Sequence, residues 1–170
     1  MLKCAGILFI LTGAFGFGGY MDACLKWHLD QLIGCREIFA QINAYREYLK
    51  LPYGELIRRS AIGKSGVLPE ILTEVAVEMG KNREANVGAL WEEAFFKRKK
   101  QLYLKEEEIG ILLALAKCLA LEGNHAQACS IYFMQLEDTI RQAMEEKKDK
   151  QKLYRAISVL GGLFLVVLLL

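Results

Sequence analysis

Apolar residues recur at steps of three and four along the middle of the chain, which is the pattern of amphipathic helices that cover one another. The first stripe runs from Leu25 to Leu49, and its charged residues lie on the other face. A short helix from Pro52 to Arg59 and a longer one from Pro69 to Met79 are predicted to follow, because proline suits the first turn of a helix. The segment 63–66 and Gly80 mark the breaks.

Three more helices are predicted in the second half of the chain. Asn82 is placed to cap a fourth helix, which carries Trp91 on its apolar face and is expected to bury it. A fifth helix starts with an acidic turn, which suits the positive end of the helix dipole, and runs to Leu121 with apolar residues almost all round. Asn124 is placed to cap a sixth helix.

The sixth helix carries an apolar stripe that gives way to a charged neck. The stripe consists of Ala128, Ile131, Tyr132, Leu136, Ile140, Ala143 and Met144. From Glu145 to Lys152 every side is polar, which indicates a solvated helix that leads directly into the C-terminal segment. No segment shows the two-residue alternation of a strand. We therefore expect an all-α bundle of about six helices in residues 22–155.

Both ends of the chain are apolar. Residues 4–21 contain no charged residue, and residues 156–170 are apolar apart from one serine. The second run reaches only about 22 Å as a helix, against a hydrocarbon core of about 30 Å, but Lys152, Tyr154 and Arg155 can extend it to the headgroups. We predict membrane helices at residues 1–21 and 156–170. The alternatives are a cleaved secretory or lipoprotein signal or a soluble start at the first end, and a buried core helix at the second.

Small residues recur at a spacing of four in both predicted membrane helices. Ala14 and Gly18 have this spacing in the first, and Ser158 and Gly162 have it in the second. Lipid supplies no hydrophobic drive for helix association, so close packing over small residues must supply it. We therefore expect Ala14 and Gly18 to face Ser158 and Gly162.

Basic residues crowd the inner end of the second predicted membrane helix. They are Lys147, Lys148, Lys150, Lys152 and Arg155. By the positive-inside rule, residues 22–155 then lie in the cytoplasm and both termini lie outside it. The five cysteines are widely spaced and odd in number, which indicates neither a disulfide framework nor a zinc site and fits a reducing compartment.

The chain carries little signal for chemistry. Gly63-Lys64-Ser65 resembles the end of a phosphate-binding loop, but that motif needs a glycine at position 58, where the chain has Arg58. His28 and His125 are the only histidines, and neither lies in a zinc motif. The net charge is only +2, which does not favour a nucleic-acid partner. We expect no catalytic residue, no metal and no cofactor.

Charged helix ends remain as the candidate partner surface, because the apolar stripes are needed for the core. The candidate residues are Lys97, Arg98, Lys99, Lys100, Glu106, Glu107 and Glu108. On this hypothesis, reversing the charge at residues 97–99 weakens partner binding and leaves the stability of the fold almost unchanged. The alternative is an ordinary solvated helix end.

The pattern as a whole resembles the stage III sporulation protein AB family over nearly the whole chain. The resemblance rests on the seam Leu32–Leu49, Tyr53-Gly54 followed by Glu55-Leu56, Ala89-Leu90-Trp91, Gln127, and above all the ending KLYRAISVLGGLFLVVLLL. The chain departs from the family pattern at two places. The family's Tyr-Gly turn is usually followed by Pro-Leu, whereas here Pro52 precedes the turn, and Asn124-His125 stands where the family usually has an acidic residue before the last helix.

The resemblance implies a non-enzymatic membrane platform of the mother cell in endospore-forming bacteria, in a channel-like assembly with the forespore. Its cytoplasmic domain would be similar in fold to the F-type platform protein of type II secretion and type IV pilus systems. It would couple a secretion-type ATPase, the AA protein of the same operon, to other membrane subunits, and a homo-oligomer is possible. The alternatives are a general secretion or pilus platform, and a membrane-attached helical enzyme or regulator that binds a ligand.

Overall fold

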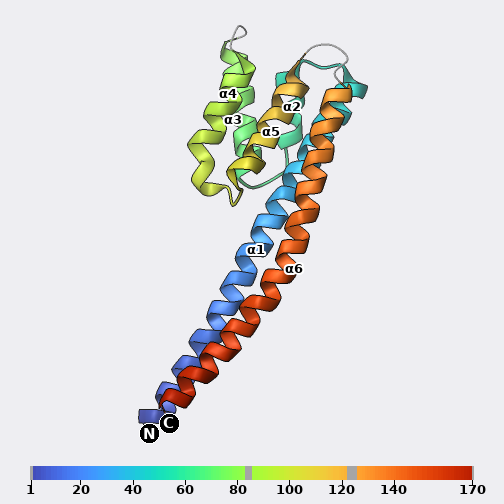
Figure 1. The fold of residues 1–170 in the computed structure, drawn as a ribbon. Coiled ribbons are helices and arrows are strands. Elements are labelled where there is room, and N and C mark those ends of the chain that lie inside the picture. Colours follow the sequence, from blue (N-terminus) through green and yellow to red (C-terminus); the bar gives the residue numbers. More distant parts are fainter. Residues whose placement is uncertain (1, 83–85, 122–125, 170) are drawn as a thin grey trace. The chain divides into compact units, whose positions relative to one another are not determined.

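The computed structural model describes residues 2–82, 86–121 and 126–169; side chains at 2–5, 7–11, 14, 15, 126, 168 and 169 are outside the description. The described residues form six α-helices and no strand, which confirms the all-α class (Figure 1). The helices are α1 (Leu2–Leu49), α2 (Tyr53–Ala61), α3 (Val67–Lys81), α4 (Val87–Arg98), α5 (Glu106–Ala120) and α6 (Ala126–Leu169), with a 3₁₀ turn at Lys99–Gln101.

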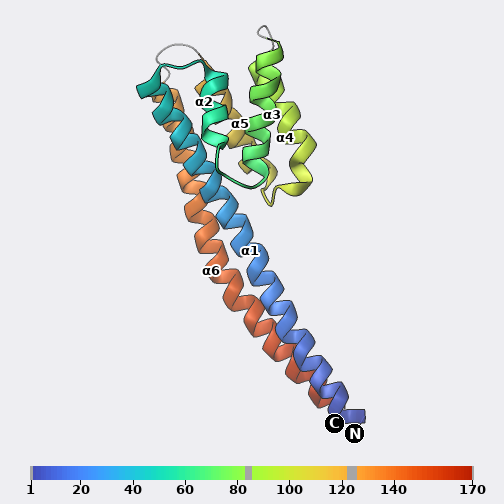
Figure 2. The same ribbon diagram turned by 180° about the vertical axis from the view of Figure 1, so that it is seen from behind.

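The chain divides into two units. Residues 30–140 form one unit, here called the bundle, which contains α2 to α5 and the adjoining parts of α1 and α6. The outer parts of the same two helices, up to Leu29 and from Arg141, form the second, here called the terminal unit. In the terminal unit α1 and α6 run antiparallel and side by side, as both views show (Figures 1 and 2).

Aromatic side chains fill the centre of the bundle. Trp91 of α4 is fully buried, and its ring centroid lies 5.9 Å from that of Phe39 of α1 and 5.9 Å from that of Phe95. Leu112 and Leu115 of α5 are also fully buried. The prediction that Trp91 belongs to the core is confirmed.

The predicted starts of α3 and α4 differ from the structure. Asn82 does not cap α4; it ends α3, where its N–H donates to the Glu78 carbonyl at 3.1 Å. Asn86 caps α4 instead, because its side chain accepts the Ala89 N–H at 3.2 Å. α3 begins two residues before Pro69, which still lies in the first turn, where no N–H is needed. Asn124 lies outside the described residues.

The predicted stripe of the sixth helix is partly wrong. Leu136, Ile140 and Ala143 are buried as expected, but Ile131 and Met144 are exposed. Cys129, which the stripe left out, is buried instead. The buried face of α6 therefore follows Cys129 and Leu136, which lie two helical turns apart.

The prediction of membrane helices at 1–21 and 156–170 falls on segments of which several side chains are outside the description. Among the residues that the structure does describe, no helix has a stretch both long and apolar enough to traverse a bilayer.

Candidate partner surface and paired terminal helices

The basic run at the end of α4 is tied to acidic residues of its own fold. Lys97 Nζ lies 2.9 Å from a carboxylate oxygen of Glu93 and 3.2 Å from one of Glu74 on α3. The Arg98 guanidinium pairs with Glu74 and lies 3.4 Å from Glu70. These ion pairs join α3 to α4 inside the bundle.

The pKa values of the cluster reflect these pairs. The hydrogen bond from Arg98 holds the pKa of Glu74 below its ordinary value of 4.5, and the hydrogen bond from Lys97 acts in the same direction. Glu74 in turn raises the pKa of Arg98. Lys97 and Arg98 are therefore structural cations, and we now expect charge reversal at these positions to destabilise the bundle, which replaces the expectation drawn from the sequence.

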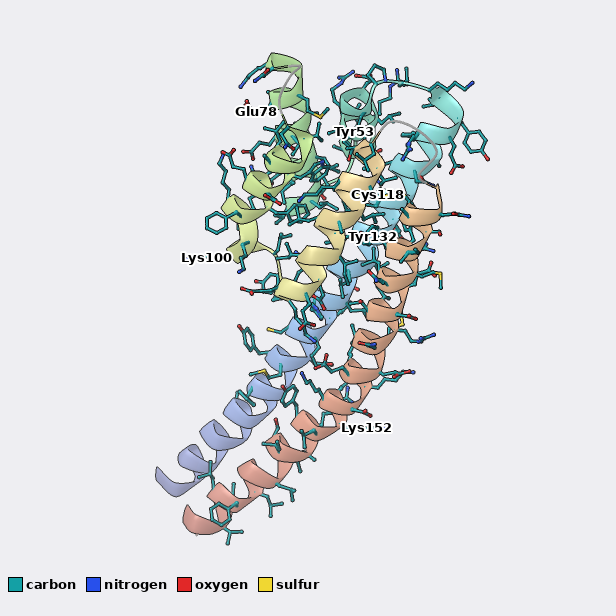
Figure 3. The ribbon with its side chains drawn as sticks, turned by 45° about the horizontal axis from the view of Figure 1, so that its top comes forward. Tyr53, Glu78, Lys100, Cys118, Tyr132 and Lys152 are labelled. Atoms are coloured by element: carbon teal, nitrogen blue, oxygen red, sulfur yellow. The ribbon has the colours of Figure 1, made fainter. Side chains whose placement is uncertain are left out.

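The remaining predicted surface residues lie around the turn from α4 to α5. Lys99 pairs with Glu106, while Lys100 and Glu107 are exposed (Lys100 is labelled in Figure 3). Glu108 is buried, and its carboxylate accepts the backbone N–H of Lys105 at 2.7 Å. Glu108 therefore caps α5 and is not available at the surface.

A groove of about 610 Å³ lies between α4 and α5 beside these charges. Its lining consists of Ala89, Glu92, Glu93, Phe95, Phe96, Lys99, Glu106, Ile109 and Leu113. Phe96 is 80% exposed, whereas its neighbour Phe95 is buried. The sequence analysis missed Phe96, although two adjacent residues on a helix lie about 100° apart and cannot both point to the core.

Small and polar residues join α1 and α6 in the terminal unit. A Cβ atom built on Gly18 would lie 2.9 Å from Oγ of Ser158, so the two helices approach closely at this point. Asp22 Oδ2 accepts a hydrogen bond from Gln151 Nε2 at 2.9 Å and lies 3.8 Å from Arg155. Gly162 is buried, and the side chain of Ala14 is outside the description.

Two cysteines meet in the bundle without forming a disulfide. Cys118 of α5 and Cys129 of α6 are both buried, and their Sγ atoms lie 2.8 Å apart (Figure 3 labels Cys118). Burial, followed by the neighbouring Cys129, raises the pKa of Cys118 to about 11, and burial raises the pKa of Cys35 to about 12. The thiols of Cys118 and Cys35 are thus protonated and poorly nucleophilic at neutral pH.

The described residues contain no group of three or more histidine, cysteine, aspartate or glutamate side chains placed to hold a metal ion.

Neither the curated proteins nor the solved structures include a significant match to the chain. One family model matches residues 3–170, and its description is stage III sporulation protein AB. Because this match covers nearly the whole chain, the protein belongs to the stage III sporulation protein AB family.

Proposed function

We propose that the protein is a non-enzymatic scaffold in a secretion-like channel between mother cell and forespore. In this role it couples the cytoplasmic ATPase, the AA protein of the same operon, to the membrane subunits of the channel. Membership of the stage III sporulation protein AB family, over residues 3–170, is the observation that carries the proposal. The bundle then acts in the cytoplasm as a platform like those of type II secretion systems, and the terminal unit attaches to the outer forespore membrane.

The groove between α4 and α5 is the surface that we assign to the ATPase. Phe96 offers an exposed aromatic ring beside the apolar side chains of Ile109 and Leu113. Lys99, Glu106 and other charged residues flank this apolar strip. An aromatic anchor within a charged rim has the anatomy of a protein–protein hot spot.

A ligand-binding regulator is less well supported by the bundle. Such a protein needs polar groups buried among the helices and directed at a ligand. Within the described residues of the bundle, the buried polar or charged residues are Ser60 and Glu108, and Nε1 of Trp91 is a further buried polar atom. Ser60 donates to the Leu56 carbonyl at 2.9 Å, and Glu108 accepts from Lys105, so both serve their own helices.

Capture of the purified ATPase by the full chain tests the assigned surface. Phe96→Ala is expected to weaken capture about tenfold or more, because it removes the exposed anchor without touching the core. Lys100→Glu is expected to give a smaller loss. Tyr48→Ala is the matched control, since Tyr48 is 82% exposed on α1. Undiminished capture by both Phe96→Ala and Lys100→Glu would exclude this surface, and absence of capture by the unaltered chain would contradict the coupling role.

Two further measurements test the setting of the proposed role. The transcript should appear only in the mother cell after engulfment begins, and expression during vegetative growth would contradict a sporulation role. Topology is tested with a single Lys64→Cys in a cysteine-free background. An impermeant maleimide should not label this cysteine in intact cells, and labelling would place the bundle outside the cytoplasm.

A further inference from the structure

Contacts between α1 and α6 fix which residues of the terminal unit lie at the same level. Gly18 lies against Ser158, and Asp22 binds Gln151 and approaches Arg155. Because the helices are antiparallel, residues that follow Asp22 in α1 lie beside residues that precede Gln151 in α6. Lys26 and Trp27 therefore lie near the level of Lys148, and Tyr20 lies near that of Arg155.

The cations at these two levels, about 10 Å apart along the helices, form a collar, defined here as Lys26, Lys148, Lys152 and Arg155. Lys26, Lys148 and Lys152 are exposed, and none of the three has a hydrogen-bond or ion-pair partner among the described residues (Figure 3 labels Lys152). The three collar residues of α6 are spaced by four and three, so they lie on one side of the helix. This side of the terminal unit therefore presents lysines that pair with no described side chain.

Carboxylates near the collar reduce its net charge, but no described carboxylate pairs with its lysines. Asp22 is occupied by Gln151, with Arg155 beside it, and Glu146 is occupied by Lys150. Asp149 and Glu145 are exposed and lie three residues before Lys152 and Lys148, on the same side of α6. No described carboxylate accepts a hydrogen bond from Lys148 or Lys152.

Exposed apolar side chains continue along α6 beyond the collar. Beyond Arg155, Ile157, Leu160 and Phe164 are 50%, 68% and 65% exposed. Tyr20 and Trp27 of α1 are exposed at the level of the collar itself. Amphipathic aromatic rings and basic residues between a charged and an apolar region are typical of the boundary between membrane and water.

We propose that the collar binds the headgroups of anionic phospholipids, with Tyr20 and Trp27 at its two ends. The charge complementarity is direct: three cations that have no partner among the described residues meet a negatively charged leaflet next to an apolar surface that lipid can cover. This inference rests on the proposed attachment of the terminal unit to a membrane and goes beyond it, because it assigns a lipid class and the residues that select it.

Quenching of Trp27 fluorescence by brominated lipid tests the inference. The full chain is reconstituted in equimolar phosphatidylglycerol and phosphatidylcholine, with one lipid brominated at a time. Trp91, the other tryptophan, is fully buried in the bundle and contributes a constant background. Brominated phosphatidylglycerol is expected to quench Trp27 more strongly than brominated phosphatidylcholine, and added salt should reduce the difference.

Lys148→Gln together with Lys152→Gln should lower the relative association constant for the anionic lipid. The expected loss is up to about fivefold for each lysine removed, which corresponds to about 1 kcal/mol each. The control variant, Lys64→Gln together with Lys81→Gln, removes the same charge from the bundle and should leave the relative association constant for the anionic lipid unchanged. Equal quenching by the two lipids, or a preference that survives the collar substitutions, would overturn the inference while leaving membrane attachment intact. No quenching by either lipid would contradict the attachment itself.

Discussion

The ion pair between α3 and α4 permits a quantitative prediction for Arg98→Gln. The side chains of Arg98 and Glu74 are 25% and 26% exposed, so the pair is neither fully solvated nor fully buried. Exposed pairs contribute about 0.2–1 kcal/mol, and breaking a buried pair costs about 3–5 kcal/mol. Lys97 remains to neutralise Glu74 in the variant. We therefore expect a loss of about 1–2 kcal/mol.

The pH dependence of this loss follows from the pKa of Glu74. Arg98 holds that pKa below 4.5, so the contribution is fully present above about pH 4.5 and disappears as the pH falls through the lowered value. The unaltered bundle should therefore lose stability on acidification, and Arg98→Gln should lose less. At pH 7 the variant should melt about 5 °C or more below the unaltered chain.

The assay uses the full chain with Trp27→Phe, so that Trp91 alone reports unfolding of the bundle. A double-mutant cycle of Arg98→Gln and Glu74→Gln should give a coupling energy of about 1 kcal/mol that shrinks at high salt. Lys100→Gln is the control, because Lys100 is exposed and has no partner among the described residues. If Arg98→Gln costs no more than Lys100→Gln, or if the coupling is zero, the structural role of the basic run is refuted.

Three further changes have outcomes fixed by the structure. The raised pKa of Cys118 favours the neutral thiol in the folded bundle, so the contribution of this thiol to stability should be fully present below about pH 9 and should be lost as the pH rises towards about 11. In a pH series of melting curves, Cys118→Ala should reduce this loss. Gly18→Val should push α1 from Ser158 and weaken a cross-link between cysteines placed elsewhere on the two helices, whereas Gly16→Val, with open space around it, should not. Asn86→Ala should cost about 1 kcal/mol in denaturant unfolding, through loss of the cap of α4, and an unchanged midpoint would contradict that role.

Local sequence signals predicted most of the helices because each helix shows its own periodicity. The burial of Leu112 and Leu115 in α5 and of Trp91 in α4 follows from apolar faces that no polar residue interrupts. The caps were harder to assign. Asn82 and Asn86 are equally good capping residues, and the choice between them depends on where α3 ends, which packing decides rather than local preference.

The charged surface was predictable only in part. The sequence shows Lys97 and Arg98 as a basic run, but it does not show that Glu74, more than twenty residues earlier, lies across from them. Glu108 looked like one of three equivalent first-turn acids, yet only one residue of that turn can reach back to the Lys105 N–H. Such pairings depend on the packing of whole helices and have no local signature.

Because the thiols of Cys118 and Cys129 are adjacent, the measured stability of a sample depends on whether they have been oxidised to a disulfide during storage. A bond between them would close a loop of about a dozen residues and remove up to about 3 kcal/mol of chain entropy from the unfolded state. In the reduced protein the same sulfur atoms lie 2.8 Å apart inside the bundle and provide no such link. Melting curves of preparations stored with and without reductant would then report two different covalent species, so the free thiols must be counted before any of the energies above are compared.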